Sequence, residues 1–386
     1  MLHRCGFWEE GAAGQSRLRL VSRKTQKFGR EAESRRRGQM SYTREVLDDV
    51  RAQLAPEDTV IKEARERRDA SKAAGESFPG ALRSYNSGSL AHGTANCPVH
   101  QRDKGLDADC GVVLDRRAYP TLGPDVFGGE GPVEIVEEMR LHVLGELRRD
   151  YPKVEAETTK RAILLTFHEP FRDGEDPTVD LVVGLTRRDA PGLWIPNTER
   201  DTWDPSDPEK HTELLTSGGR ELRRSRAHAI RLAKAENKRT SPAPLCSFNV
   251  EAFGWMFVEA GESDPEALLA LWRRGADDLS QRLTPDPAGV SAPIKVEDMQ
   301  LAVDRLSEAA DRLERALARD WDTQYVREQL QPLWPDFINI TGDQAATKAR
   351  LAAAIKSKSN VAVTTTGALT TGAGLRLKQS RSYGNE

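Results

Sequence analysis

Two apolar segments of this chain contain aspartates that a purely structural strand does not require. The segment 107–114 opens with Asp-x-Asp, and the segment 178–183 holds Asp180 at its third position. Alternate residues of a strand point to the same face, so Asp107 and Asp109 would present their carboxylates side by side. Each aspartate taken alone could instead cap a turn before a strand or lie on a solvent-facing edge.

A cluster of three such carboxylates favours bound cations. Two carboxylates about 5 Å apart repel by roughly 3 kcal/mol even at an effective dielectric of about 20. A divalent cation reverses the sign of that energy, and Mg²⁺ prefers hard oxygen ligands. We therefore predict that Asp107, Asp109 and Asp180 are catalytic residues and hold two Mg²⁺ ions.

A Gly-Ser pair, Gly88-Ser89, precedes the Asp-x-Asp by about twenty positions. Glycine permits a close approach of the backbone to a ligand, and serine offers a hydroxyl and an amide to phosphate oxygens. Gly93-Thr94 extends the same cradle. Three acidic side chains beside a phosphate-binding turn indicate metal-dependent nucleotidyl transfer.

Length, charge and cysteine content limit the classes of protein to which this chain can belong. The chain has 386 residues, enough for two domains, and 57 Lys and Arg against 60 Asp and Glu give a net charge of -3. The whole molecule is therefore no general attractor for nucleic acid, and any phosphate site must be a local patch. The four cysteines show no CxxC pairing, which argues against a zinc site or disulfide framework. No stretch predicts a secretory signal or a membrane span, so we expect a cytoplasmic protein.

Four regions are expected along the chain. Residues 1–39 are basic, with little apolar periodicity, and predict a disordered extension, although a short basic run could also form a nucleic-acid-binding arm. Residues 40–200 predict an α/β domain, and residues 201–356 predict a helical domain. The Thr-, Gly- and Ser-rich segment 357–386 predicts a flexible tail.

Periodicity predicts the main elements of both domains. Strands are expected at 110–114, 162–167 and 179–185. Helices are expected at 42–74 with a break near Pro56, and at 133–149, 219–238, 248–258, 265–283 and 296–321. The fold class is therefore α/β, with a mixed-sheet lobe followed by a helical lobe.

The ordered set of Gly-Ser, Asp-x-Asp and a later strand aspartate resembles the polymerase-β-like nucleotidyltransferase superfamily. Within it, the chain resembles the bacterial CD-NTases, relatives of cyclic GMP-AMP synthase and oligoadenylate synthase. The resembling stretches cover roughly residues 80–260. They are GSLAHGT at 88–94, DADCGVVL at 107–114, WDPSDPEKH at 203–211 and PLCSF at 244–248.

The resemblance implies a bilobal enzyme that makes a cyclic di- or oligonucleotide signal from ribonucleoside triphosphates in anti-phage defence, read by a downstream effector. By motif position, Lys234 and Ser247 would contact the donor triphosphate together with Gly88, Ser89 and Thr94. A lysine point charge and a serine at a helix start both suit phosphate. Lys234 could instead lie on a solvated helix face, and Ser247 could be a simple N-cap.

Other functions remain open from the residues alone. The same triad could transfer a nucleotide onto RNA, an antibiotic or a protein, or the fold could serve as a non-catalytic nucleotide or RNA sensor. We expect His211 to be structural, and Trp203 to anchor its loop unless it stacks on a base.

Overall fold

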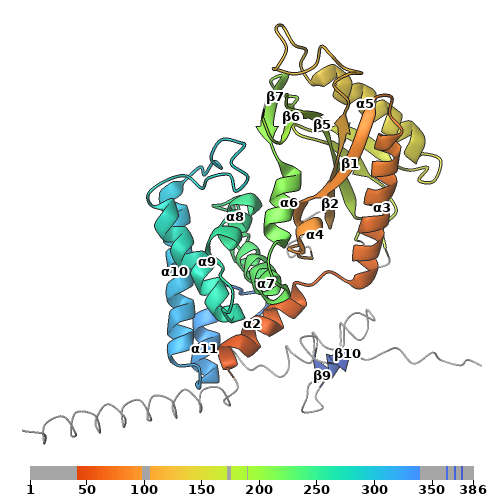
Figure 1. The fold of residues 1–386 in the computed structure, drawn as a ribbon. Coiled ribbons are helices and arrows are strands. Elements are labelled where there is room, and N and C mark those ends of the chain that lie inside the picture. Colours follow the sequence, from red (N-terminus) through yellow and green to blue (C-terminus); the bar gives the residue numbers. More distant parts are fainter. Residues whose placement is uncertain are drawn as a thin grey trace, which may run out of the picture.

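The computed structural model describes residues 41–97, 105–171, 175–188 and 190–339, with three two-residue strands between 362 and 376. Figure 1 shows a lobe built around a sheet beside a lobe of helices. The expected extension at 1–39 lies outside the described residues. So does the expected tail, except for β8 (Ala362–Val363), β9 (Leu369–Thr370) and β10 (Leu375–Arg376), which pair in the order β10-β8-β9.

In the described part of the chain, seven strands form one mixed sheet. Its main path runs β1-β2-β5-β4-β3, while β6 pairs with β5 and β7. β2 and β5 are parallel neighbours, and the other pairs are antiparallel. The strands are β1 (Ala81–Ser87), β2 (Asp107–Leu114), β3 (Glu155–Thr158), β4 (Ile163–Thr166), β5 (Thr178–Thr186), β6 (Leu193–Asn197) and β7 (Thr202–Ser206).

Two helices, α3 (Asp58–Glu76) and α5 (Val133–Leu147), cover this sheet. α5 buries Val136, Met139 and Val143 at helical spacing against residues of β2 and β5, so its apolar stripe faces the sheet core. The central strands are buried on both faces, which explains their nearly continuous apolar sequence. The third helix of this lobe, α4 (Gly88–His92), directly follows β1.

The second lobe is helical. Its core gathers apolar residues from several helices around two fully buried tryptophans, Trp272 and Trp334, whose ring centroids are 5.8 Å apart. α6 lies between β7 and this lobe in the ribbon. The helices are α6 (Pro208–Thr216), α7 (Arg220–Asn237), α8 (Ser247–Phe257), α9 (Asp264–Leu279), α10 (Met299–Ala318) and α11 (Thr323–Leu330).

The first described helix, α2 (Tyr42–Gln53), precedes the sheet in sequence but packs into the core of the helical lobe. Its buried residues Val46, Leu47 and Val50 lie on one face, and Leu54 continues that face. The chain thus contributes helices to the second lobe both before and after the strands of the sheet in sequence. The domain boundary expected at residue 200 remains a prediction. In the structure the strands of the sheet continue to Ser206.

The expected α/β class with a helical second lobe is confirmed, and an α-helix or β-strand lies at each of the expected positions. Four strands of the main sheet (β1, β3, β6 and β7) and three helices (α4, α6 and α11) were not expected. β1 has no apolar alternation, and both β6 and β7 contain a proline. None of the helices in the described residues combines the length and apolar character that a membrane crossing requires.

The packing of α2 makes a stability prediction. Leu47 is 1% exposed in the helical core, whereas Leu141 on α5 is 56% exposed. Leu47→Ala should destabilise the protein by about 2–5 kcal/mol because it leaves a cavity, and Leu141→Ala should cost less than about 0.5 kcal/mol. Denaturant unfolding followed by circular dichroism measures both. Equal effects of the two substitutions would contradict the placement of α2.

Candidate active site

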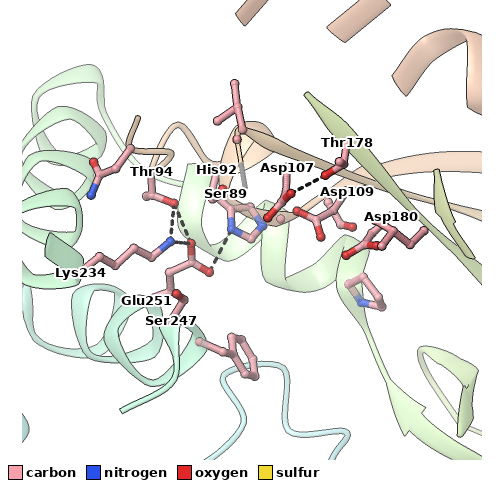
Figure 2. Close-up of a pocket in the computed structure, with 18 of the residues that line it drawn as sticks. Ser89, His92, Thr94, Asp107, Asp109, Thr178, Asp180, Lys234, Ser247 and Glu251 are labelled. Carbon is pink, nitrogen blue, oxygen red and sulfur yellow. Dashed lines mark hydrogen bonds and ion pairs between the residues drawn. The ribbon is translucent and has the colours of Figure 1, made fainter. Parts of the chain in front are cut away.

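The three predicted carboxylates come from two neighbouring strands. In the parallel pair of β2 and β5, Asp109 lies opposite Asp180, and Asp107 lies opposite Thr178. Ala108, Cys110 and Val112 alternate with the aspartates along β2 and are buried in the sheet core. Asp107 and Asp109 therefore face the other side of the sheet. Figure 2 shows Asp107, Asp109 and Asp180 grouped at one end of these strands.

Asp107 has a partner of its own within this group. The Thr178 hydroxyl donates a 2.5 Å hydrogen bond to its carboxylate, which holds the side chain toward β5. Thr178 is the first residue of β5, so this contact joins the starts of the two strands. The pairing register and this hydrogen bond together bring three acidic side chains from distant parts of the chain close to one another.

Burial and mutual repulsion disturb the ionisation of these groups. Burial, and then the charges of Asp180, Asp107 and Glu251, raise the pKa of Asp109 to about 7, although Lys234 opposes the rise. Burial and the charge of Asp107 raise the pKa of Asp180 to about 6. The protein by itself therefore supplies too little positive charge to keep the cluster fully ionised.

A glycine is required beside Asp109. Ser87 at the end of β1 lies opposite Asp109, and the chain then turns at Gly88 with φ +69°. A Cβ atom on Gly88 would overlap the Asp109 carboxylate. The Gly-Ser pair thus brings the backbone into contact with the acidic cluster, and Ser89 follows within α4 at the same cavity.

Lys234 points from α7 into a buried polar cluster. Its ammonium forms a 2.6 Å ion pair with Glu251 on α8, and it donates a 3.3 Å hydrogen bond to the Thr94 hydroxyl. Thr94 donates to the same Glu251 oxygen at 2.6 Å. His92 Nδ1 lies 3.2 Å from the other oxygen of Glu251. Lys234 is therefore buried at the junction of the lobes and is not on a solvated helix face.

Glu251 and His92 were missed by the sequence analysis. Glu251 follows Ser247 by four positions on α8, a spacing that places both on one helix face. His92 lies inside the GSLAHGT stretch, between the Gly-Ser pair and Thr94. These spacings are a weak signal, because nothing in the sequence indicates that Lys234 would choose Glu251 as its partner.

Ser247 is the first residue of α8, but it is not the N-cap. Cys246 occupies that position, and the Asn249 side chain completes the capping interaction. Ser247 is exposed, and it lies near Glu251 on the helical side of the cavity in Figure 2. The N-cap interpretation of Ser247 is therefore wrong.

One cavity of about 1150 Å³ brings the predicted residues together. It opens between the lobes, with carboxylates on the sheet side and Lys234 on the helical side. All eight predicted site residues line it: Gly88, Ser89, Thr94, Asp107, Asp109, Asp180, Lys234 and Ser247.

The two aromatic residues of the 203–211 stretch have structural contacts. His211 Nε2 lies 2.6 Å from Asp286, and its ring packs on Phe248 at 4.7 Å between centroids. Trp203 is buried, and its indole N–H donates to the Glu130 carbonyl at 3.0 Å. Trp203 thus anchors β7, and His211 joins α6 to the loop that holds Asp286.

Within the described ranges, no group of three or more His, Cys, Asp or Glu side chains is arranged as a ready metal site. The three carboxylates nevertheless suit a hard divalent cation, which prefers oxygen ligands. Burial and like charge raise the pKa of two of them, Asp109 and Asp180. A cation between them would remove the repulsion that raises those values.

Among known proteins, this chain matches solved structures but no sequence family. No family model matches the chain, and no curated protein matches it in sequence. Solved structures do match over most of their length. The Vibrio cholerae DncV apo form has a TM-score of 0.58 at 12% identity, covering 78% of this chain and 95% of that one.

Two further CD-NTase structures agree. Escherichia coli MS115-1 CdnC with ATP has a TM-score of 0.55 at 16% identity, covering 77% of this chain and 98% of that one. Bradyrhizobium diazoefficiens CdnG with GTP has a TM-score of 0.52 at 16% identity, covering 75% and 96%. The chain therefore has the bilobal nucleotidyltransferase fold of the bacterial CD-NTases.

Proposed function

We propose that this protein is a Mg²⁺-dependent nucleotidyltransferase that joins ribonucleoside triphosphates into a cyclic di- or oligonucleotide. The observation that carries the proposal is the convergence of Asp107, Asp109 and Asp180 opposite Lys234 across one cavity. Carboxylates suit cations, and a lysine suits the polyphosphate that accompanies them. Such a pairing is what phosphoryl transfer requires of a protein, since it acts by positioning and charge stabilisation.

The roles of individual residues follow from their places. Asp107, Asp109 and Asp180 would hold two Mg²⁺ ions, which when bound neutralise the charge that develops on the leaving pyrophosphate. Asp180 would orient a ribose hydroxyl and accept its proton as the oxygen attacks the α-phosphate of a second triphosphate. Lys234 and Ser247 would bind the triphosphate from the helical side, with Gly88, Ser89 and Thr94 on the sheet side.

The cyclic product is supported by analogy with the matching structures. DncV is described as a cyclic AMP-GMP synthase, and one of its structures holds the linear intermediate 5′ pppA(3′,5′)pG. CdnC and CdnG were solved with ATP and GTP. The anti-phage role, the downstream effector and the cytoplasmic location remain predictions from the resemblance and composition.

The product identifies the function. Purified protein with Mg²⁺ and all four ribonucleoside triphosphates should release pyrophosphate and form a product that resists phosphatase, because a ring has no terminal phosphate. Mass spectrometry of the mixture gives its composition. Label transferred to added RNA, an antibiotic or a protein would instead indicate a transferase for that acceptor, and triphosphate binding without pyrophosphate release would indicate a sensor.

Asp109→Asn should reduce pyrophosphate release to below about 1% of the unsubstituted rate while the protein still folds, because a neutral amide binds the cation poorly. Asp115→Asn is the matched control, since Asp115 lies just beyond the other end of β2 and pairs with Arg117. Retained turnover in the double variant Asp107→Asn, Asp109→Asn would refute the assignment.

The raised pKa values predict how stability depends on pH when metal is removed with EDTA. The folded protein keeps protons on Asp109 and Asp180 up to about pH 7 and 6, whereas the ordinary aspartate value is 3.8. The free energy of unfolding from these groups is therefore greatest in acid and falls as the pH rises through this range. Asp109→Asn should then melt higher than the unsubstituted protein at about pH 8, with a smaller difference at about pH 5.

Mg²⁺ should change that comparison. At about pH 8 it should raise the melting temperature of the unsubstituted protein more than that of Asp109→Asn, because binding to the folded state alone stabilises it. Thermal scans with EDTA and with Mg²⁺ measure both effects. An identical response of the two proteins to Mg²⁺ would argue against a cation site at Asp109.

Gly88→Ala should reduce turnover at least about tenfold, because the added Cβ displaces the Asp109 carboxylate. Gly128→Ala is the matched control: Gly128 has a similar φ of +66°, and its Cβ would meet nothing within 4 Å. Both substitutions should cost about 1–2 kcal/mol of backbone strain, so similar melting temperatures with unequal turnover are expected. Equal turnover in the two variants would contradict the close approach at Gly88.

A further inference from the structure

Glu251 is the centre of the buried polar cluster between the lobes. One of its oxygens accepts from Lys234 and Thr94, both at 2.6 Å, and the other lies 3.2 Å from His92 Nδ1. The side chains of Lys234, Glu251 and His92 are only 8%, 7% and 5% exposed. Two contributors, Lys234 and Glu251, belong to the helical lobe, and the other two follow β1 in the sheet lobe.

The ionisation of Glu251 is consistent with this geometry. Burial opposes its charge, but Lys234 and His92 together hold the pKa of Glu251 well below its usual range. An ionised carboxylate is acceptor-only, so His92 Nδ1 must carry the hydrogen in that contact. Removing Glu251 would leave the donors around it without their common acceptor.

The hydrogen-bond arrangement leaves part of Lys234 available. An ammonium has three N–H donors. Among the described contacts, Glu251 takes one N–H and Thr94 takes a second, which leaves a third for a ligand. Lys234 also lines the cavity that contains the three aspartates. It can therefore meet an anion there without leaving Glu251.

We propose that Glu251 is a positioning residue that fixes the Lys234 ammonium against Thr94 of the opposite lobe, so that the remaining N–H binds the triphosphate. This role rests on the proposed function. A lysine has a long flexible side chain, and a charged partner restricts it to one arrangement before the nucleotide arrives. The same cluster holds the helical lobe at a fixed distance from the carboxylates of β2 and β5.

The first test uses no nucleotide. Treatment with an amine-reactive succinimidyl ester, followed by peptide mass spectrometry, reports the reactivity of each lysine. Lys234 should be protected in the unsubstituted protein and react at least about tenfold faster in Glu251→Gln, because a neutral amide holds the ammonium weakly. Exposed Lys62 is the internal reference. Unchanged Lys234 reactivity would overturn the proposal.

A matched control separates positioning from loss of stability. Glu236 is also buried on α7 and pairs with Arg239 at 2.8 Å, but it does not line the cavity. Glu236→Gln should lower the melting temperature while Lys234 stays protected and the KM for triphosphate is unchanged. If Glu236→Gln exposes Lys234 as much as Glu251→Gln does, general loosening explains the effect and the proposal fails.

The second test asks whether Glu251 acts through Lys234. Glu251→Gln should raise the KM about tenfold with a smaller change in kcat, because Lys234 binds the triphosphate in both ground and transition states. Glu251→Asp, which keeps the charge, should restore part of the affinity. In a Lys234→Met background, Glu251→Gln should have no further effect on the Kd of each Mg²⁺-ribonucleoside triphosphate measured by calorimetry.

The outcomes distinguish this role from the proposed function. Triphosphate binding by the unsubstituted protein that does not depend on Glu251, or additive effects of the two substitutions, would overturn the positioning role alone. Absence of any triphosphate binding would overturn both. Binding with the expected coupling but no pyrophosphate release would support the positioning role and remove the proposed catalysis.

Discussion

The parallel pairing of β2 with β5 is the constraint on which the site depends. It places Asp109 opposite Asp180, and the antiparallel pairing of β1 with β2 brings Ser87 opposite Asp109. The Gly88 turn must therefore follow at the same end of the sheet. A shift of one residue in either register would move side chains to the other face, because successive residues of a strand alternate.

This arrangement concentrates negative charge at one end of β2 and β5, where Asp109 and Asp180 are partly buried. Asp109 and Asp180 have a raised pKa for that reason, and the nearby Glu251 adds to the effect on Asp109. A fold optimised for stability alone would not bury like charges together. The cost of this repulsion is understandable if the site binds cations and polyphosphate, and Lys234 is a buried cation that the helical lobe contributes to the cavity.

Much of the fold was predictable because its elements have a strong periodic signal. α5 and α10 repeat apolar residues at helical spacing, and β5 is an apolar run interrupted only by Asp180. β1 was not predictable in this way, since it is a polar edge strand that gains its structure from pairing with β2. The packing of α2 against helices that follow the sheet was equally hidden, because sequence neighbours need not be neighbours in space.

By itself, the sequence determined which residues could carry the chemistry: the Gly88-Ser89 pair, the Asp-x-Asp at the start of β2, the aspartate within β5 and the later Lys234 and Ser247. Residue type and local spacing suffice for that, because they are properties of short segments. Only the tertiary structure decided that these groups line one cavity, that Gly88 contacts Asp109 and that Glu251 is the partner of Lys234. Those outcomes depend on strand register, burial and the meeting of two lobes, which are set by the packing of the described chain as a whole.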